Sequence, residues 1–252
     1  MVEAWKLPLL FSTGLVAGFV DSIAGGGGLI TLPVMLGIGL GPQDALGTNK
    51  LQATFGSGSA AWHYARAKTV PLKDCTRTFA LTLAGAALGT NVVQRLDPVF
   101  LKRAIPVLLI GVAIYVLLKP QVGTEDLHPR IGRGWFDLVF GLALGFYDGF
   151  LGPGTGTFWT MAFMVGLGFN MTKATGYTKV MNLGSNLSSL AFFLSAGSVH
   201  FLPGLTMGLG QLLGARIGSG LVIKRGAKLI RPVFVSVVLA LTVKLLYDAY
   251  AN

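Results

Sequence analysis

The sequence has few charged residues and almost no cysteine. Only 12% of its 252 residues are charged, whereas a soluble domain carries roughly 25%. The single cysteine, Cys75, excludes a disulfide framework and a cysteine-based metal site. In contrast, 52% of the residues are hydrophobic. This composition predicts a polytopic helical membrane protein rather than a soluble domain.

Patterns that indicate enzymes and metal sites are also missing. The histidines His63, His128 and His200 are scattered, and none belongs to a His-Glu-x-x-His pair. The Gly-Ser-Gly-Ser run at 56–59 falls inside an expected helix, so it is not the strand-to-helix turn of a hydrolase nucleophile. The sequence therefore argues against an enzyme and predicts no metal and no cofactor.

Acidic residues are scarce, and 20 Lys and Arg against 10 Asp and Glu give a net charge of +10. A basic protein can bind nucleic acid, but no basic cluster here is interleaved with aromatic residues, as single-strand binding requires. Membrane proteins concentrate Lys and Arg in cytoplasmic loops. We therefore expect membrane lipid as a partner and no nucleic acid, and the oligomeric state stays open, a homo-oligomer included.

The apolar segments fall into two sets of five. The first set is 5–22, 28–40, 42–66, 76–94 and 98–118, and the second is 134–150, 155–168, 172–196, 204–222 and 228–250. The start of the chain lacks a basic region and a small-residue cleavage site, so 5–22 is expected to be a mature helix. We predict a first transmembrane repeat at 1–118, a cytoplasmic linker at 119–133 and a second transmembrane repeat at 134–252.

The two sets are copies of each other. Gly18–Gly41 and Gly145–Gly168, 127 positions apart, are identical at 8 of 24 positions, including the Gly-Phe opening, an Asp and the closing Gly-Leu-Gly. In each copy a glycine-rich break follows the Asp, and a lysine follows the break. Glycine is abundant throughout, at 36 residues, which suits close packing of helices in lipid. The repeat predicts a duplicated site.

Segments 28–40 and 155–168 are too short to cross a bilayer, since each covers about 20 Å of a hydrocarbon core of roughly 30 Å. Paired interruptions in two halves are the best sequence indication of a transporter's binding site. If the two halves were inverted, the cytoplasmic loops would hold 11 basic residues and the outer loops 5. This bias toward the cytoplasmic side is the one that membrane proteins show. We predict an all-α bundle of two inverted repeats, each with a broken, re-entrant half-helix pair followed by three spanning helices. It would be multi-pass in the cytoplasmic (inner) membrane, with both termini outside.

Lys50 and Lys179 are the strongest candidates for a binding site. Each lies about eight residues inside its expected helix, and an intramembrane charge costs at least about 2.5 kcal/mol on insertion scales, so such residues are usually functional. Polar residues share their helix faces, which predicts a polar cavity, although the same residues could pack helices together. The candidates for orienting a ligand are Asn49, Gln52, Asn182 and Asn186.

The glycine breaks supply the rest of the expected site. Helices that begin after them would present free backbone N–H groups to an anion, which makes candidates of Gly26, Gly27, Gly28, Gly154 and Thr155. Asp21 and Asp148 precede the breaks, and two roles are open for them: capping the N–H groups or pairing with the lysines and carrying protons. Arg216 is a further charge in an apolar segment, without a counterpart in the first half.

With these motifs the chain resembles the sulfite exporter TauE/SafE family of membrane anion transporters. The resemblance rests on the run 18–27, on Gly47-Thr48-Asn49-Lys50, and on the second copy at 145–156 with Gly176–Lys179, where Tyr177-Thr178-Lys179 replaces Thr-Asn-Lys. It implies export of sulfite or a small organosulfonate, and nothing in composition or spacing shows sulfur chemistry.

The sequence thus predicts a secondary transporter for a small sulfur-containing oxyanion. It would work by alternating access and be coupled to an ion or a proton. Replacing Lys50 or Lys179 with Ala is expected to abolish anion binding and leave the protein folded. Two other classes stay open: a passive anion channel, and an intramembrane binding or assembly protein that transports nothing.

Overall fold

The protein is described here by a computed structural model, which defines residues 6–118 and 125–225. Within these ranges the regular secondary structure is all helical, with no strand. The helices are α1 (Lys6–Ala24), α2 (Gly27–Gly37), α3 (Pro42–Arg66), the 3-10 helix η1 (Leu72–Cys75), α4 (Thr76–Gln94), α5 (Pro98–Leu118), α6 (Arg133–Phe150), α7 (Thr155–Leu167), α8 (Met171–Ser195) and α9 (Phe201–Arg225).

The all-helical prediction is confirmed for this part of the chain. The expected segments 42–66, 76–94 and 98–118 coincide with α3, α4 and α5. At the other extreme, α9 extends three residues beyond its expected range at each end. The sequence pattern does not predict η1, because four residues are too few to show a helical period. The expected segment 228–250 lies outside the described residues.

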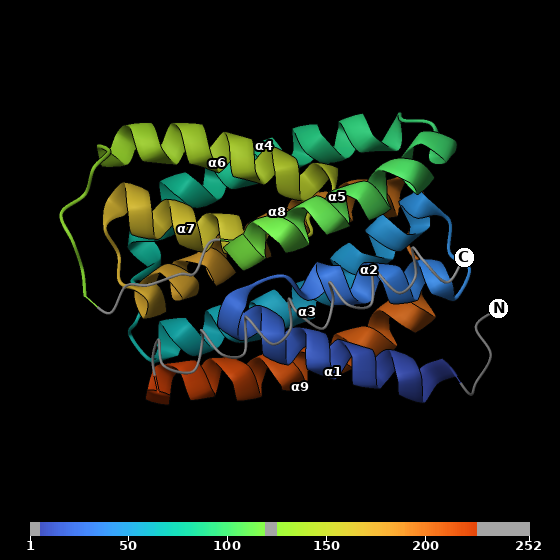
Figure 1. Ribbon diagram of the computed structural model, residues 1–252, viewed down its shortest axis with the longest axis horizontal. Helices are drawn as coiled ribbons and strands as arrows, with labels where there is room; N and C mark the ends of the chain where they lie inside the picture. The colour runs from blue at the N-terminus through green and yellow to red at the C-terminus, as the bar shows by residue number, and fades with distance from the viewer. Residues whose placement is uncertain (1–5, 119–124, 226–252) are drawn as a thin grey trace.

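Helices of one half pack on helices of the other. α1 lies along α9, and at the opposite edge of the molecule α6 lies along α4 (Figure 1). Between these two pairs, α3 contacts both α8 and α9, while α8 contacts both α3 and α4. The short helices α2 and α7 lie beside α3 and α8, respectively. Each half therefore completes its packing only in the presence of the other.

Glycines allow the backbones of α1 and α9, and those of α4 and α6, to come into direct contact. A Cβ added to Gly18 would lie 2.4 Å from the carbonyl oxygen of Gln211, and one added to Gly149 would lie 2.1 Å from that of Ala86. In the reverse direction, a Cβ at Gly214 would lie 2.0 Å from the Leu15 carbonyl oxygen. Small residues of this kind let helices associate in lipid by direct van der Waals contact.

The outer helix faces are apolar. Large hydrophobic side chains such as Val16, Leu88, Val92, Leu209 and Ile217 are exposed on the edge helices. Exposed apolar surface on this scale marks contact with a membrane or a partner rather than with water. By length and composition alone, α1 is the helix in the described ranges that qualifies as a membrane span, and half of its apolar stretch is buried inside the protein.

The described part of the linker, from residue 125, is hydrogen-bonded to the C-terminal end of α7 and the N-terminal end of α8. The backbone N–H of Leu127 donates to the carbonyl of Gly168 at 2.7 Å. Asp126 accepts hydrogen bonds from the backbone and side chain of Asn170 and pairs with Lys173 at 3.0 Å. The hydrogen bond from the Asn170 backbone is the main cause that lowers the pKa of Asp126.

Protonation of Asp126 should weaken this attachment slightly. Because the pKa is lower in the folded state, the contribution of Asp126 to stability is complete above its unfolded pKa. It is lost as the pH falls through the folded pKa. The side chain is 48% exposed, so we expect Asp126→Asn to cost less than about 1 kcal/mol. Melting curves of both proteins measured down an acidic pH series should converge, and a gap that persists at low pH would contradict this.

Candidate functional site

Each half of the chain is interrupted by glycines in the left-handed conformation. Gly25 and Gly26, between α1 and α2, have φ of +82° and +90°, and Gly152 and Gly154, between α6 and α7, have φ of +91° and +79°. Side chains other than glycine rarely tolerate this conformation. The glycine runs of the sequence therefore determine where α1 and α6 stop and where the short helices begin.

The two breaks touch each other. A Cβ added to Gly25 would lie 2.7 Å from the backbone nitrogen of Thr157, and one added to Gly156 would lie 2.9 Å from the Cα of Gly25. The hydroxyl of Thr157 donates to the carbonyl of Ala24 at 3.3 Å. The start of α7 therefore packs against the end of α1, so that residues 133 positions apart form one local structure.

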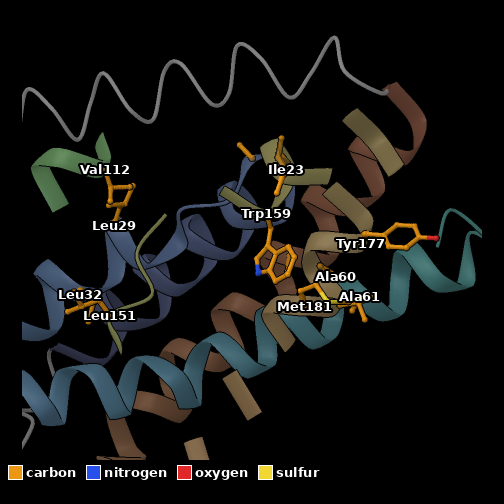
Figure 2. Close-up of a cluster of buried hydrophobic side chains, with 14 of the residues drawn as sticks. Ile23, Leu29, Leu32, Ala60, Ala61, Val112, Leu151, Trp159, Tyr177 and Met181 are labelled. Atoms are coloured by element: carbon orange, nitrogen blue, oxygen red, sulfur yellow. The ribbon is translucent and has the colours of Figure 1, made fainter. Parts of the chain in front are cut away.

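Buried hydrophobic side chains surround this contact. Figure 2 shows the indole of Trp159, from α7, between Ile23 at the end of α1 and the pair Ala60 and Met181 from α3 and α8. Tyr64 adds a polar anchor, since its hydroxyl donates to the carbonyl of Ser22 at 3.0 Å. The breaks are thus fixed by packing on both sides and are not loose loops.

The charged residues of the two copies pair across the halves. Lys50 Nζ lies 2.7 Å from Asp148 Oδ1, and Lys179 Nζ lies 2.9 Å from Asp21 Oδ2. Both lysine side chains are almost completely buried, at 1% and 0% exposure. Each lysine therefore binds the aspartate of the other repeat. Two positive and two negative charges cancel, three of them buried and that of Asp21 partly exposed, and they join the halves at the level of the breaks.

The two aspartates differ in how firmly they are held. Asp148 binds Lys50, which also donates to the Asp148 backbone carbonyl, and its second carboxylate oxygen accepts a hydrogen bond from Ser185. Asp21 binds Lys179 and accepts the backbone N–H of Gly27 at 3.1 Å. The Asp21 side chain is 19% exposed and that of Asp148 is 5% exposed. Asp21 is therefore the more accessible carboxylate.

A small cavity of about 40 Å³ lies where the breaks meet. It has room for about three water-sized molecules. Its lining comes from both halves and consists of Asp21, Gly26, Gly27, Gly28, Asn49, Ala53, Asp148, Gly152, Gly154, Thr155, Gly156, Asn182, Asn186 and Gln211.

Helix N-termini supply hydrogen-bond donors to this cavity. Gly28 and Gly156 are the second residues of α2 and α7, and both line the cavity. First-turn N–H groups have no acceptor within their own helix, and the helix dipole adds positive potential at this end. Two such termini that meet at one cavity favour an anion there.

Asn49 is held in a defined orientation. Its Oδ1 accepts hydrogen bonds from Thr31 at 2.6 Å and from Gln52 at 2.7 Å. Because its oxygen is occupied by two donors, Asn49 has its amide N–H groups left for the cavity that it lines. Gln52 is fully buried and does not line the cavity, so its hydrogen bond fixes the orientation of the Asn49 amide that does.

The structure brings most residues of the predicted site together. Ten of them line the cavity: Asp21, Gly26, Gly27, Gly28, Asn49, Asp148, Gly154, Thr155, Asn182 and Asn186. Lys50 and Lys179 lie behind the carboxylates that they bind, outside the lining itself. Arg216 is exposed on α9 and does not line the cavity.

Four lining residues were not predicted from the sequence. Gly152 and Gly156 belong to the second break, and extending the candidate range by two residues on each side would have included them. Ala53 carries no polar group, so no pattern could single it out. Gln211 lies on α9, and its Oε1 lies against Gly56 of α3. An isolated amide in an apolar segment was the available signal for Gln211.

No metal or nucleophile site is evident in this region. In the ranges that the structure defines, no group of three or more His, Cys, Asp or Glu side chains is placed to hold a metal ion. Cys75 is buried in η1, and burial raises the pKa of its thiol to about 12. A thiol with such a pKa remains protonated and unreactive near neutral pH.

The helical bundle with apolar outer faces is that of a helical membrane protein, and comparisons with known proteins define the class further. The family model described as sulfite exporter TauE/SafE matches residues 10–245. The chain therefore belongs to the TauE/SafE family, a family of membrane transporters.

Several curated proteins are similar over most of their length. The chain is 44% identical over 252 residues to the probable membrane transporter protein YfcA of Escherichia coli K12, covering all of this chain and 94% of that protein. It is 47% identical over 242 residues to the probable membrane transporter protein ORF9 of a Sinorhizobium species, covering 96% and 93%. The sulfite exporter TauE/SafE family protein 3 of Arabidopsis thaliana is 26% identical over 131 residues, which is 51% of this chain and 28% of that protein. No solved structure matches the chain.

Proposed function

We propose that this protein is a secondary transporter that exports a small sulfur-containing oxyanion across the cytoplasmic membrane by alternating access. One observation carries the proposal: the breaks of the two halves meet at a cavity where helix N-termini, amides and crossed Lys–Asp pairs converge. The family name supports sulfite as the substrate class. The cavity of about 40 Å³ suits sulfite better than a longer organosulfonate.

The proposed architecture is a pair of inverted repeats. α2 and α7 have 11 and 13 residues, so they extend about 16 Å and 20 Å, short of a hydrocarbon core of roughly 30 Å. We propose that they are re-entrant half-helices that place their N-termini near the middle of the membrane. Broken helices at corresponding places in two halves are typical of transporter sites. The multi-pass topology with both termini outside belongs to the same proposal.

The crossed ion pairs suggest how binding is coupled to protons. An anion at the N-termini of α2 and α7 would compete with Asp21 for the charge of Lys179. A proton taken up by Asp21 would relieve this competition and balance the charge of the anion. Asp148, held by Lys50 and Ser185, would keep Lys50 in place. Rocking of one half against the other would then expose the loaded cavity on the opposite side.

Flux measurements in proteoliposomes test this proposal. We expect sulfite flux through the wild-type protein to rise when a proton gradient is imposed. Asp21→Asn, which keeps the shape of the side chain and removes its titration, should abolish this rise. Asp148→Asn serves as the comparison and should instead lower the melting temperature, because it removes the charge that binds Lys50.

The alternatives give different results in the same experiment. A sulfite flux that ignores the proton gradient in the wild-type protein would indicate a passive anion channel. No flux of any sulfur oxyanion from well-folded protein would indicate an intramembrane binding or assembly protein. A gradient response that survives Asp21→Asn would show that the proton is carried elsewhere.

A further inference from the structure

The carboxamide of Asn182 lies in the cavity without a hydrogen-bond partner. The residue is 6% exposed, and its Oδ1 is buried and unpaired within residues 6–118 and 125–225. Its Nδ2 also has no acceptor in those ranges. A buried amide oxygen that receives no hydrogen bond costs free energy comparable to a lost hydrogen bond. Such an amide in a binding cavity indicates a ligand that supplies both partners.

The Asn182 amide lies near the N-terminus of α7 and near Lys179, two groups proposed to bind the anion. A Cβ added to Gly156 would lie 3.2 Å from Asn182 Nδ2 and 3.5 Å from Lys179 Nζ. The N-terminus of α7 at Gly156 therefore lies close to the Asn182 amide and to the Lys179 ammonium, and Gly156 and Asn182 line the same cavity. An anion on this side of the cavity would meet the N-terminus of α7 and the Asn182 amide, with the Lys179 ammonium nearby.

The other asparagines of the cavity each make side-chain hydrogen bonds. Asn49 accepts two hydrogen bonds through its Oδ1, and Asn186 donates to Ser57 Oγ at 3.3 Å. Asn49 can therefore offer only its N–H donors to a ligand. A fully deprotonated anion needs only such donors. Asn182 offers a donor and an acceptor side by side, and a fully deprotonated anion has nothing to give to the acceptor.

We propose that the transported species is a protonated oxyanion, one with an O–H beside an oxygen acceptor, and that Asn182 selects it by a two-point hydrogen bond. This inference rests on the proposed function and narrows its substrate class. The O–H donates to Asn182 Oδ1, and the neighbouring oxygen accepts from Nδ2. The other oxygens accept from the helix N-termini and Lys179. Hydrogen sulfite and hydrogen carbonate share this chemistry, and both fit a cavity of about 40 Å³.

Two pairs of small anions test the effect of the O–H group on binding while charge and shape stay the same within each pair. Hydrogen sulfite and chlorate are pyramidal monoanions, and hydrogen carbonate and nitrate are planar monoanions; only the first of each pair has an O–H group. Dissociation constants for the purified full-length protein in detergent are obtained from thermal shifts, because a ligand of the folded state raises the melting temperature. We expect the donor-bearing anion of at least one pair to bind about tenfold more tightly than its partner, as an unsatisfied buried acceptor predicts. The pair that shows the larger ratio identifies the preferred anion.

Asn182→Leu removes both amide atoms and nearly preserves the volume of the side chain. In this variant the affinity ratio within each pair should fall to about one. Asn91→Leu is the matched control, because it makes the same change on α4 away from the cavity lining; it should keep the wild-type ratio. A purely structural role of Asn182 would lower all four affinities together and leave the ratios unchanged.

The result that overturns the inference is distinct from the failure of the proposed function. Equal affinities within both pairs in the wild-type protein, or wild-type ratios in Asn182→Leu, would overturn the selection of a protonated anion and leave anion transport standing. No binding of any of the four anions would overturn both. The wild-type ratios can be measured even if Asn182→Leu does not fold.

Discussion

Lys50→Met should abolish the proposed sulfite transport and destabilise the protein by about 3–5 kcal/mol, because it leaves the Asp148 carboxylate buried without its cation. The ammonium of Lys50 binds a carboxylate oxygen and the backbone carbonyl of Asp148, and the pair is almost fully buried. The sequence-based expectation that lysine variants stay folded therefore changes for Lys50. Melting temperatures in detergent and sulfite flux in liposomes measure the two effects.

A double variant separates charge from function. Lys50→Met with Asp148→Leu removes both charges, and replacing a buried ion pair by apolar residues is often neutral or stabilising. We expect it to recover most of the stability and none of the transport. Lys173→Ala is the control for an exposed pair, with 31% and 48% exposure of Lys173 and Asp126, and should cost less than about 1 kcal/mol. Equal effects of Lys50→Met and Lys173→Ala would contradict the importance of the buried pair.

Lys179→Met is expected to behave differently from Lys50→Met. Its partner Asp21 is partly exposed and retains the backbone N–H of Gly27, so the loss of the lysine leaves a carboxylate that water and protons can reach. We therefore expect a smaller loss of stability together with the full loss of anion binding. The two lysines occupy matched positions in the repeats, but their surroundings give them unequal roles.

Gly25→Ala and Gly156→Ala should each eliminate transport. At Gly25 the new methyl group would lie 2.7 Å from a backbone nitrogen, in a conformation with φ of +82° that alanine rarely adopts. At Gly156 it would lie 2.9 Å from the Cα of Gly25 and would occupy the space beside Asn182 and Lys179. Backbone atoms cannot move aside locally, so the two breaks must separate.

The control for both variants is Gly111→Ala on α5, where an added Cβ meets no atom of residues 6–118 and 125–225 within 4 Å. Alanine is favoured over glycine by about 1 kcal/mol inside a helix, so this variant should be at least as stable as the wild-type protein. Melting temperature, sulfite binding and flux should be measured for all three. Normal flux in Gly156→Ala would mean that substrate does not pass the contact between the breaks.

Local patterns predicted the helices well and their lateral contacts poorly. α3, α4 and α5 begin and end where proline, glycine and charge punctuation place them. The exchange of partners, with α1 on α9 and α6 on α4, could not be read from the repeat. A duplicated sequence is equally compatible with two halves that each fold alone.

The same limit applies to the site. The matched Asp and Lys of each copy were recognisable, but the pattern permits Asp21 to pair with Lys50 as readily as with Lys179. The distinct environments of Asn49, Asn182 and Asn186 depend on neighbours from other helices, such as Thr31 for Asn49 and Ser57 for Asn186. No spacing within one helix specifies them.

The sequence by itself determined the helical class, the two copies and the positions of the breaks, because apolar length, helical period and the conformational freedom of glycine act over a few neighbouring residues. The tertiary structure alone decided which lysine meets which aspartate, how large the cavity is and which amide stays unpaired. The two ion pairs join residues 98 and 158 positions apart, Lys50 with Asp148 and Asp21 with Lys179, and such contacts form only when the halves pack together.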